Sequence, residues 1–189
     1  GHQPANRLGV PSSGNSAGPH VFLGVLTASE DPEPGDPGAS RAIDRDYLEA
    51  SVLNHVTYLY GFNLGFAELL VRDLAAEQMV AQPAGVINHP AWSLGHLVVS
   101  AHGLGQLLGL ESNLAEGWSE TFKTGGEPSG DMQAYPSKAE ILGALKEQHA
   151  RNAEAVKNID TSRFAEPHPN EGARKRFPTV GDMIIFLMT

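Results

Sequence analysis

Histidine is the residue type in this sequence with the most scope for chemistry. There are eight histidines and no cysteine, so thiol nucleophiles, disulfides and Cys-ligated zinc are excluded. His96 differs from the others, because helical spacing places it beside Trp92, Val99 and Leu107. An imidazole among apolar neighbours needs a polar partner. Two interpretations are open: a core histidine hydrogen-bonded to a carbonyl group, or a metal ligand, since histidine is the commonest one in proteins.

The remaining histidines are weaker candidates. Three lie in Gly/Pro-rich or polar stretches and are expected to be solvated: His2, His20 and His168. His55 falls on the expected buried face of the first helix and is interpreted as a core or interface residue, and His149 lies at the edge of a buried stripe. His89 shares a side of its helix with His96, but the two lie about 10 Å apart along the axis, too far to bind one ion.

Four segments carry the helical pattern that must position these residues. They cover residues 44–74, residues 88–108, residues 137–159 and the stretch that begins at Thr179. In the first segment the expected buried face has three- and four-residue spacing: Leu48, Val52, Leu59, Phe62, Phe66 and Leu70. The second is apolar almost all round, so we expect it to be central or to form part of a subunit interface. No strand pattern is present, and the predicted fold class is all-α, a four-helix bundle.

Local signals mark the starts of the later helices and one long connection. Three cap signals are present: Asn88 or His89 before Pro90, Ser137 with Glu140, and Thr179 with Asp182. The connection at residues 110–136 is long for a compact domain, and such loops are usually functional or tightly packed. We expect Trp118 and Phe122 to anchor it.

The two ends of the sequence depart from this pattern. Residues 1–40 are crowded with Gly, Pro, Ser and Asp, so they are expected to be a disordered or artefactual N-terminal segment before a domain at residues 44–189. The sequence starts at Gly1 and stops at Thr189 directly after an apolar run, without the Gly, Asn or basic residue that commonly ends a helix. It is therefore interpreted as a fragment whose fourth helix is truncated.

Charge and hydropathy exclude some partners. The formal net charge of −9 argues against nucleic acid, because phosphate binding needs clustered Lys and Arg. The basic run Arg174-Lys175-Arg176 is expected to be a solvated loop. No apolar run approaches the ~20 residues that span a bilayer, so no membrane partner is expected. The absence of cysteine fits a reducing compartment, and we expect a cytoplasmic location.

The segment at residues 88–97 resembles a signature of the DinB-like superfamily, through the spacing Trp92-x-x-Gly95-His96. Later pieces follow in the matching order: Trp118, Phe122 and Gly125, then Tyr135-Pro136-Ser137 with Glu140, then residues 177–182. The resemblance covers residues 44–189.

The resemblance implies a DinB/YfiT-like four-helix bundle, often a homodimer, with a divalent metal ion held by three histidines. The metal is typically zinc or nickel. The first ligand is the histidine of the signature, here His96. The other two form an H-x-x-x-H pair on the fourth helix, directly after a run that reads Ile185-Phe186-Leu187-Met188-Thr189 in this sequence. The fragment therefore carries one of three expected ligands and is expected to bind metal weakly.

For function, the resemblance implies a metal-dependent enzyme with a small-molecule substrate. It would be a transferase that uses a low-molecular-weight thiol, such as bacillithiol, mycothiol or glutathione, or a hydrolase. A three-histidine ion with an open position stabilises a thiolate or activates water. The alternative is a non-catalytic metal-binding or dimerising helical module of a stress response.

Overall fold

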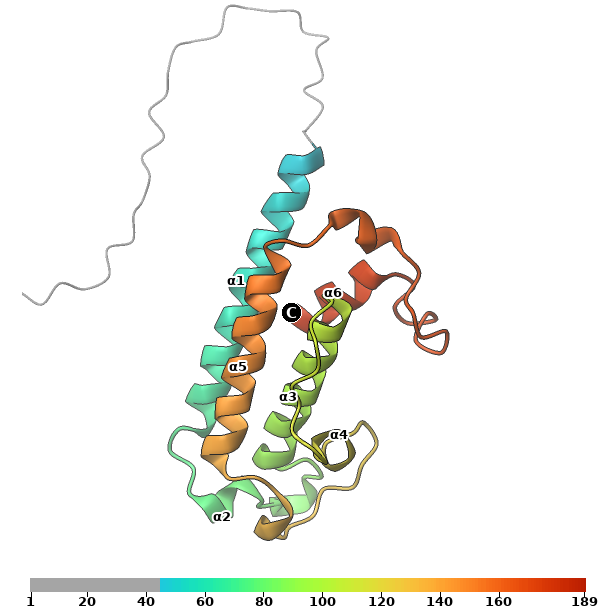
Figure 1. The fold of residues 1–189 in the computed structure, drawn as a ribbon. Helices are drawn as coiled ribbons and strands as arrows, with labels where there is room; N and C mark the ends of the chain where they lie inside the picture. Colours follow the sequence, from blue (N-terminus) through green and yellow to red (C-terminus); the bar gives the residue numbers. More distant parts are fainter. Residues whose placement is uncertain (1–44) are drawn as a thin grey trace, which may run out of the picture. The chain divides into compact units, whose positions relative to one another are not determined.

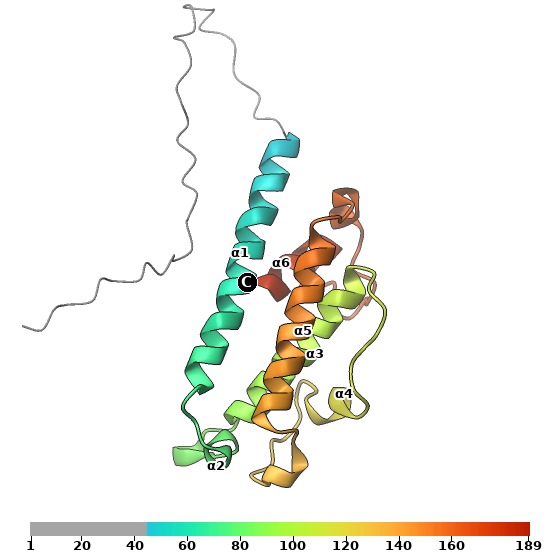
Figure 2. The same ribbon diagram turned by 60° about the vertical axis from the view of Figure 1, so that its left-hand side comes forward.

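Three long helices lie side by side in the part of the chain that the structure describes, residues 45–189 of a computed structural model. They are α1 (Arg45–Val71), α3 (Pro90–Leu107) and α5 (Lys138–Val156), and the shorter α6 (Val180–Met188) packs against α1 and α3 (Figures 1 and 2). Shorter turns complete the described fold: α2 (Ala76–Met79), η1 (Pro83–Gly85), α4 (Trp118–Thr121), η2 (Met132–Ala134) and η3 (Thr161–Ala165). The prediction of an all-α bundle is confirmed. The segment at residues 1–40, expected to be disordered or artefactual, lies outside the described residues.

The connection between α3 and α5 runs back along the bundle, because these two helices are parallel neighbours (Figure 1). Both begin at the end where α2 lies, so residues 108–137 return the length of α3 before α5 starts. The side chain of Phe122 is fully buried, and the half-buried Trp118 packs on it with ring centroids 5.4 Å apart. The expectation that these two aromatic residues anchor the connection is confirmed.

The helices begin where the cap signals place them. His89 caps α3, since its side chain accepts a hydrogen bond from the backbone N–H of Trp92 at 3.1 Å, and Pro90 occupies the first position. Reciprocal capping boxes start α5 and α6: Ser137 with Glu140 for α5, and Thr179 with Asp182 for α6. Each box satisfies two backbone N–H groups that helical geometry leaves without partners. These starts are therefore determined by local sequence.

The end of α1 is capped from a distant part of the chain. Lys138 Nζ donates to the backbone carbonyl oxygens of Val71 at 2.6 Å and of Arg72 and Leu74 at 2.9 Å. The last carbonyl groups of a helix have no partner within it and carry partial negative charge. One ammonium group therefore satisfies three acceptors and ties the start of α5 to the end of α1.

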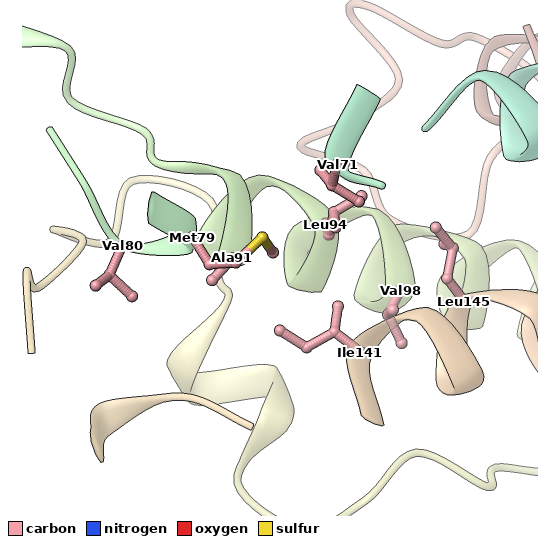
Figure 3. Close-up of a cluster of buried hydrophobic side chains, with 8 residues drawn as sticks. All are labelled: Val71, Met79, Val80, Ala91, Leu94, Val98, Ile141 and Leu145. Carbon is pink, nitrogen blue, oxygen red and sulfur yellow. The ribbon is translucent and has the colours of Figure 1, made fainter. Parts of the chain in front are cut away.

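Two clusters of buried apolar side chains hold the helices together. The first joins the end of α1, α2, α3 and α5 (Figure 3): Val71, Met79, Val80, Ala91, Leu94, Val98, Ile141 and Leu145. The second joins α1, α3, α5 and α6: Val56, Tyr60, Leu104, Val156, Val180, Ile184 and Met188. Val98 and Leu104 of α3 have no exposed surface, which agrees with the expectation that this helix is central.

The predicted buried face of α1 is wrong. Its described members are exposed by 43 to 62%: Val52, Leu59, Phe62, Phe66 and Leu70. The side chain of Leu48 lies outside the described residues. The helix instead buries Val56, Tyr60 and Val71. Apolar residues occur on most sides of α1, so spacing alone does not select the face that α5 and α6 cover.

Two histidines lie in surroundings that the sequence did not fully predict. His55 is not a core residue of the described chain, since it is exposed and its Nδ1 lies 2.6 Å from the carbonyl oxygen of Ser51; its alternative placement in an interface stays a prediction. His168, expected to be solvated, is only 6% exposed. The loop before α6 folds back, so that the backbone N–H of His168 donates to the carbonyl of Pro178 at 3.0 Å and its Nδ1 accepts from the N–H of Asn170 at 3.1 Å. Hydrogen bonds within this polar loop pair its backbone groups, and the resulting fold of the loop buries the ring of His168.

The basic run of the chain lies at the surface of the described structure. Arg174, Lys175 and Arg176 are all exposed, as a solvated basic run should be. None of the described helices has the length and apolarity that a membrane crossing requires.

Gly95 of α3 leaves no room for a side chain, because a Cβ atom there would overlap the ring of Phe122. We expect Gly95→Ala to lower the free energy of unfolding by about 1–3 kcal/mol, the usual cost of overpacking. Gly103→Ala on the same helix is the matched control, since nothing lies within 4 Å of its Cβ position. It should be neutral or stabilising by up to about 1 kcal/mol. Urea denaturation measures both, and equal unfolding midpoints for the two variants would contradict the close approach.

Candidate functional site

A pocket of about 510 Å³ lies between α1, α3, α5 and α6, and we call it the inter-helix pocket. Its walls come from residues 60–70, residues 96–101, Leu145 with His149, and residues 186–189. Most of the lining side chains are aliphatic or aromatic. Volumes of about 300–1,000 Å³ with mainly apolar walls and a few polar groups are typical of small-molecule sites.

His96 reaches this pocket from α3 with its ring orientation fixed. Its Nδ1 lies 2.8 Å from the carbonyl oxygen of Phe122. Because a carbonyl oxygen only accepts hydrogen bonds, Nδ1 carries the proton, and Nε2 of the neutral ring is an acceptor. The ring also stacks on the indole of Trp92, with centroids 5.0 Å apart and planes within 3°. This leaves one imidazole nitrogen available to a molecule or an ion in the pocket.

Gly95 explains how the carbonyl of Phe122 comes within reach of His96. The ring of Phe122 packs directly on the backbone at Gly95, which a side chain would prevent. Phe122 also ends α4, where its N–H bonds the carbonyl of Trp118 at 3.0 Å. The signature residues of α3 therefore act together: the indole of Trp92 stacks on the imidazole, the glycine admits the connection, and His96 donates to it.

Asn152 orders another wall of the pocket. It is fully buried in α5, and its Nδ2 donates to the hydroxyl of Tyr60 at 3.0 Å and to the carbonyl of Ala101 at 2.7 Å. One amide group thus joins α5 to α1 and α3. Burial raises the pKa of Tyr60 to about 12, against the smaller opposing effect of the Asn152 hydrogen bond, so the phenol is protonated at neutral pH.

His149 is a second imidazole of the pocket, although the sequence made it a weak candidate. Its ring stacks on that of Tyr60, with centroids 3.8 Å apart and planes within 7°. Burial lowers the pKa of His149 from 6.5 to about 4, so the ring is neutral at pH 7. Its Nδ1 is buried and has no hydrogen-bond partner in the described part of the chain.

The other histidines of residues 45–189 are engaged elsewhere. Nδ1 of His89 accepts from Trp92, and its Nε2 donates to the carbonyl of Ser129 at 2.9 Å, so both nitrogens are used. Nε2 of His102 lies 3.3 Å from the hydroxyl of Ser112. Within the described range, only His96 and His149 place an imidazole on the inter-helix pocket.

Two buried polar residues of α5 were missed, although the sequence holds a signal for them. The buried positions of α5 follow three- and four-residue spacing: Ile141, Leu145, Gln148, Asn152 and Val156. Gln148 Nε2 donates to Oδ1 of Asn113 at 2.8 Å. A polar residue in phase with an apolar stripe indicates an internal hydrogen-bond partner, because burial without one is costly.

Metal-ligating side chains do not gather in threes in the described structure. Among residues 45–189 no group of three or more His, Cys, Asp and Glu side chains is placed to hold a metal ion. The described residues therefore do not form a complete metal centre by themselves.

The fold and the pocket define an all-α helical bundle with a site between its helices. Residues 67–189 match the model of the DinB superfamily. The match covers more than half of the chain, and the chain belongs to this superfamily. No curated protein and no solved structure matches the chain.

The buried ring of His149 should make stability depend on pH. Its folded pKa of about 4 lies below the ordinary value of 6.5, so the unfolded chain takes up the proton first as pH falls. The free energy of unfolding should therefore fall between pH 6.5 and pH 4. His149→Phe keeps a stacking ring without this titration. It should lose about 1–2 kcal/mol less than the wild type over that range, less than the full shift implies because the ring is partly open to solvent.

Urea denaturation at pH 7.5, 5.5 and 4 measures this difference. Other titrating groups, His102 among them, are common to both proteins and cancel in the comparison. Parallel stability curves for the two proteins would show that the imidazole of His149 is not held neutral by the fold.

Proposed function

We propose that this DinB-superfamily protein is divalent-metal-dependent and that the inter-helix pocket takes its small-molecule substrate, with His96 supplying one metal ligand through Nε2. The supporting observation is the hydrogen bond from Nδ1 of His96 to the carbonyl of Phe122 at 2.8 Å. Metal-binding histidines commonly donate their second ring N–H to a carbonyl or carboxylate, which fixes the tautomer and the ring orientation. A structural histidine in a core also makes such a hydrogen bond, but its role does not require the ring to line a pocket.

The donor chemistry of the described residues fits one ligand position. A neutral imidazole with a free Nε2 suits zinc or nickel, the metals we propose. The described residues provide no group of three ligands, so we assign His96 alone and derive no reaction step through the ion.

The activity that we propose is group transfer to a low-molecular-weight thiol, or hydrolysis. A bound divalent ion lowers the pKa of a coordinated thiol or water and so supplies a nucleophile at neutral pH. The contribution of the chain is to orient His96 between Trp92 and the Phe122 carbonyl. The apolar walls at Leu145 and Phe186 would exclude water from one side of the substrate.

Replacement of His96 tests the ligand assignment. In a chain that also carries the two further histidines implied after Thr189, His96→Ala should reduce the affinity for Zn²⁺ or Ni²⁺ by at least about 10- to 100-fold, since even loss of an outer partner of a metal ligand typically costs that much. Calorimetric titration with each metal gives the affinity, elemental analysis gives the bound metal, and circular dichroism should show unchanged helicity.

His55→Ala is the control for this experiment. It removes an exposed imidazole that contacts its own helix at Ser51 and takes no part in the pocket. It should bind metal as the wild type does. Equal metal content in wild type and His96→Ala would remove His96 from the ligand set.

A dimerising helical module is the second candidate, favoured by the exposed apolar residues of α1. They are Val52, Leu59, Phe62, Phe66, Leu69 and Leu70. Between residues 51 and 70 Glu68 is the single Asp, Glu, Lys or Arg, and it pairs with Lys146 at 2.5 Å. A chain of net charge −9 repels its copies least along such a face. A second copy related by a two-fold axis would bury both faces, and we propose this homodimer.

Sedimentation velocity tests the homodimer. Phe62→Glu places a charge in the middle of the apolar face, where the side chain is 58% exposed, and should shift the protein from dimer to monomer. Ile87→Glu is the matched control, since that side chain is 70% exposed in the segment before α3, and it should leave the dimer intact. A wild type that sediments as a monomer at every concentration would contradict the proposal.

A further inference from the structure

We propose that the inter-helix pocket selects a small, neutral molecule with an apolar body and one protic head, a hydroxyl or a thiol, and that His149 binds this head. The inference deepens the proposed function, because it concerns the same pocket, but it needs no metal ion. It assigns a role to a side chain of α5 that lies apart from His96 in the sequence and on another wall of the pocket.

The ring of His149 is held in one plane. It lies flat on Tyr60, with centroids 3.8 Å apart, and Tyr60 is itself held by the hydrogen bond from Asn152 at 3.0 Å. A side chain with so little freedom loses little further entropy when it binds a ligand. His149 is therefore organised for contact before any ligand arrives.

The hydrogen-bonding state of His149 leaves a group for the ligand. Nδ1 is buried without a hydrogen-bond partner in the described chain, and the residue lines the pocket, so we assign the contact with the ligand to Nε2. A hydroxyl both donates and accepts, and a thiol does so more weakly, so either head pairs with Nε2 whichever nitrogen carries the proton.

The charge of the pocket explains why the head should be neutral. The sixteen lining residues include no Asp, Glu, Lys or Arg. Burial also keeps His149 uncharged at pH 7, because it lowers the pKa of the ring to about 4. A charged head would lose its hydration and gain no counter-charge from these side chains, which is unfavourable.

The rest of the lining sets the body of the ligand. Leu64, Phe66, Leu97, Leu145 and Phe186 present apolar surface to the pocket. The hydroxyl of Tyr60 accepts from Asn152, and Asn63 Nδ2 donates to the carbonyl of Thr189 at 2.8 Å. Ser100 and His96 are further polar side chains of the lining. Apolar burial is the main source of affinity, and we assign selection of the head to the imidazole of His149.

Phenol and toluene test the proposal, because they share a ring and differ in the hydroxyl. Affinities of the whole chain, treated with a chelator, are measured for both probes by calorimetry or by NMR titration. In His149→Phe the ratio of phenol to toluene affinity should fall by about tenfold relative to wild type, the effect of one hydrogen bond, while toluene still binds. In His55→Ala, which removes an exposed imidazole outside the pocket, the ratio should be unchanged.

The outcomes separate this inference from the metal assignment. If the ratio falls in His96→Ala and not in His149→Phe, the head binds His96 and the proposal is overturned. A ratio that is unchanged in both variants would also overturn the proposal. Failure of either probe to bind the wild type would also overturn it. A direct readout needs no variant: phenol, and not toluene, should shift the imidazole nitrogen resonances of His149 in the wild-type protein. Metal binding by His96 is measured in a separate experiment, so a negative result for the phenol contact does not affect the metal assignment, and the reverse also holds.

Discussion

The buried amide of Asn152 is the interaction on which the rest of the described structure depends. It donates to the hydroxyl of Tyr60 and to the carbonyl of Ala101, and so sets three helices in one register. Gly105 accommodates it, because a Cβ there would lie 2.9 Å from Oδ1 of the amide. A buried donor that loses its partner costs about 1–3 kcal/mol. Sliding one helix along another would break these hydrogen bonds, so it costs more free energy than it would in a bundle held by apolar packing alone.

The same amide links the register of the bundle to the shape of its pocket. By holding Tyr60 it fixes the surface on which His149 stacks. On α3 the indole of Trp92 does the same for His96. The two imidazoles reach one pocket in different states. A carbonyl sets which nitrogen of His96 carries the proton, and burial keeps His149 uncharged. Rigid, differently prepared polar groups on an apolar wall suit a site that discriminates between small molecules.

Sequence reasoning succeeded where the determining interactions are local. The capping boxes at Ser137 and Thr179 span four residues each, so the starts of α5 and α6 follow from a few positions. It failed on the buried face of α1. Apolar residues lie on several sides of this helix, so the packing of α5 and α6 determines which side is buried. The partner of His96 could be anticipated as a carbonyl, but not as that of Phe122, because the contact depends on how a long connection returns. The metal role of His96 is still a prediction.

The hydrogen bond that orients His96 joins residues 26 positions apart. It cannot form until the segment after α3 has turned back and seated its aromatic ring on the bare backbone at Gly95. Because the entropy of closing such a loop must be lost before the contact is gained, helix formation and preparation of the imidazole are separate events in folding. An excised α3, or its signature grafted onto another helical scaffold, would carry the right residues with an undefined tautomer. Such a graft must also include the connection after α3, because the carbonyl of Phe122 in that segment orients His96.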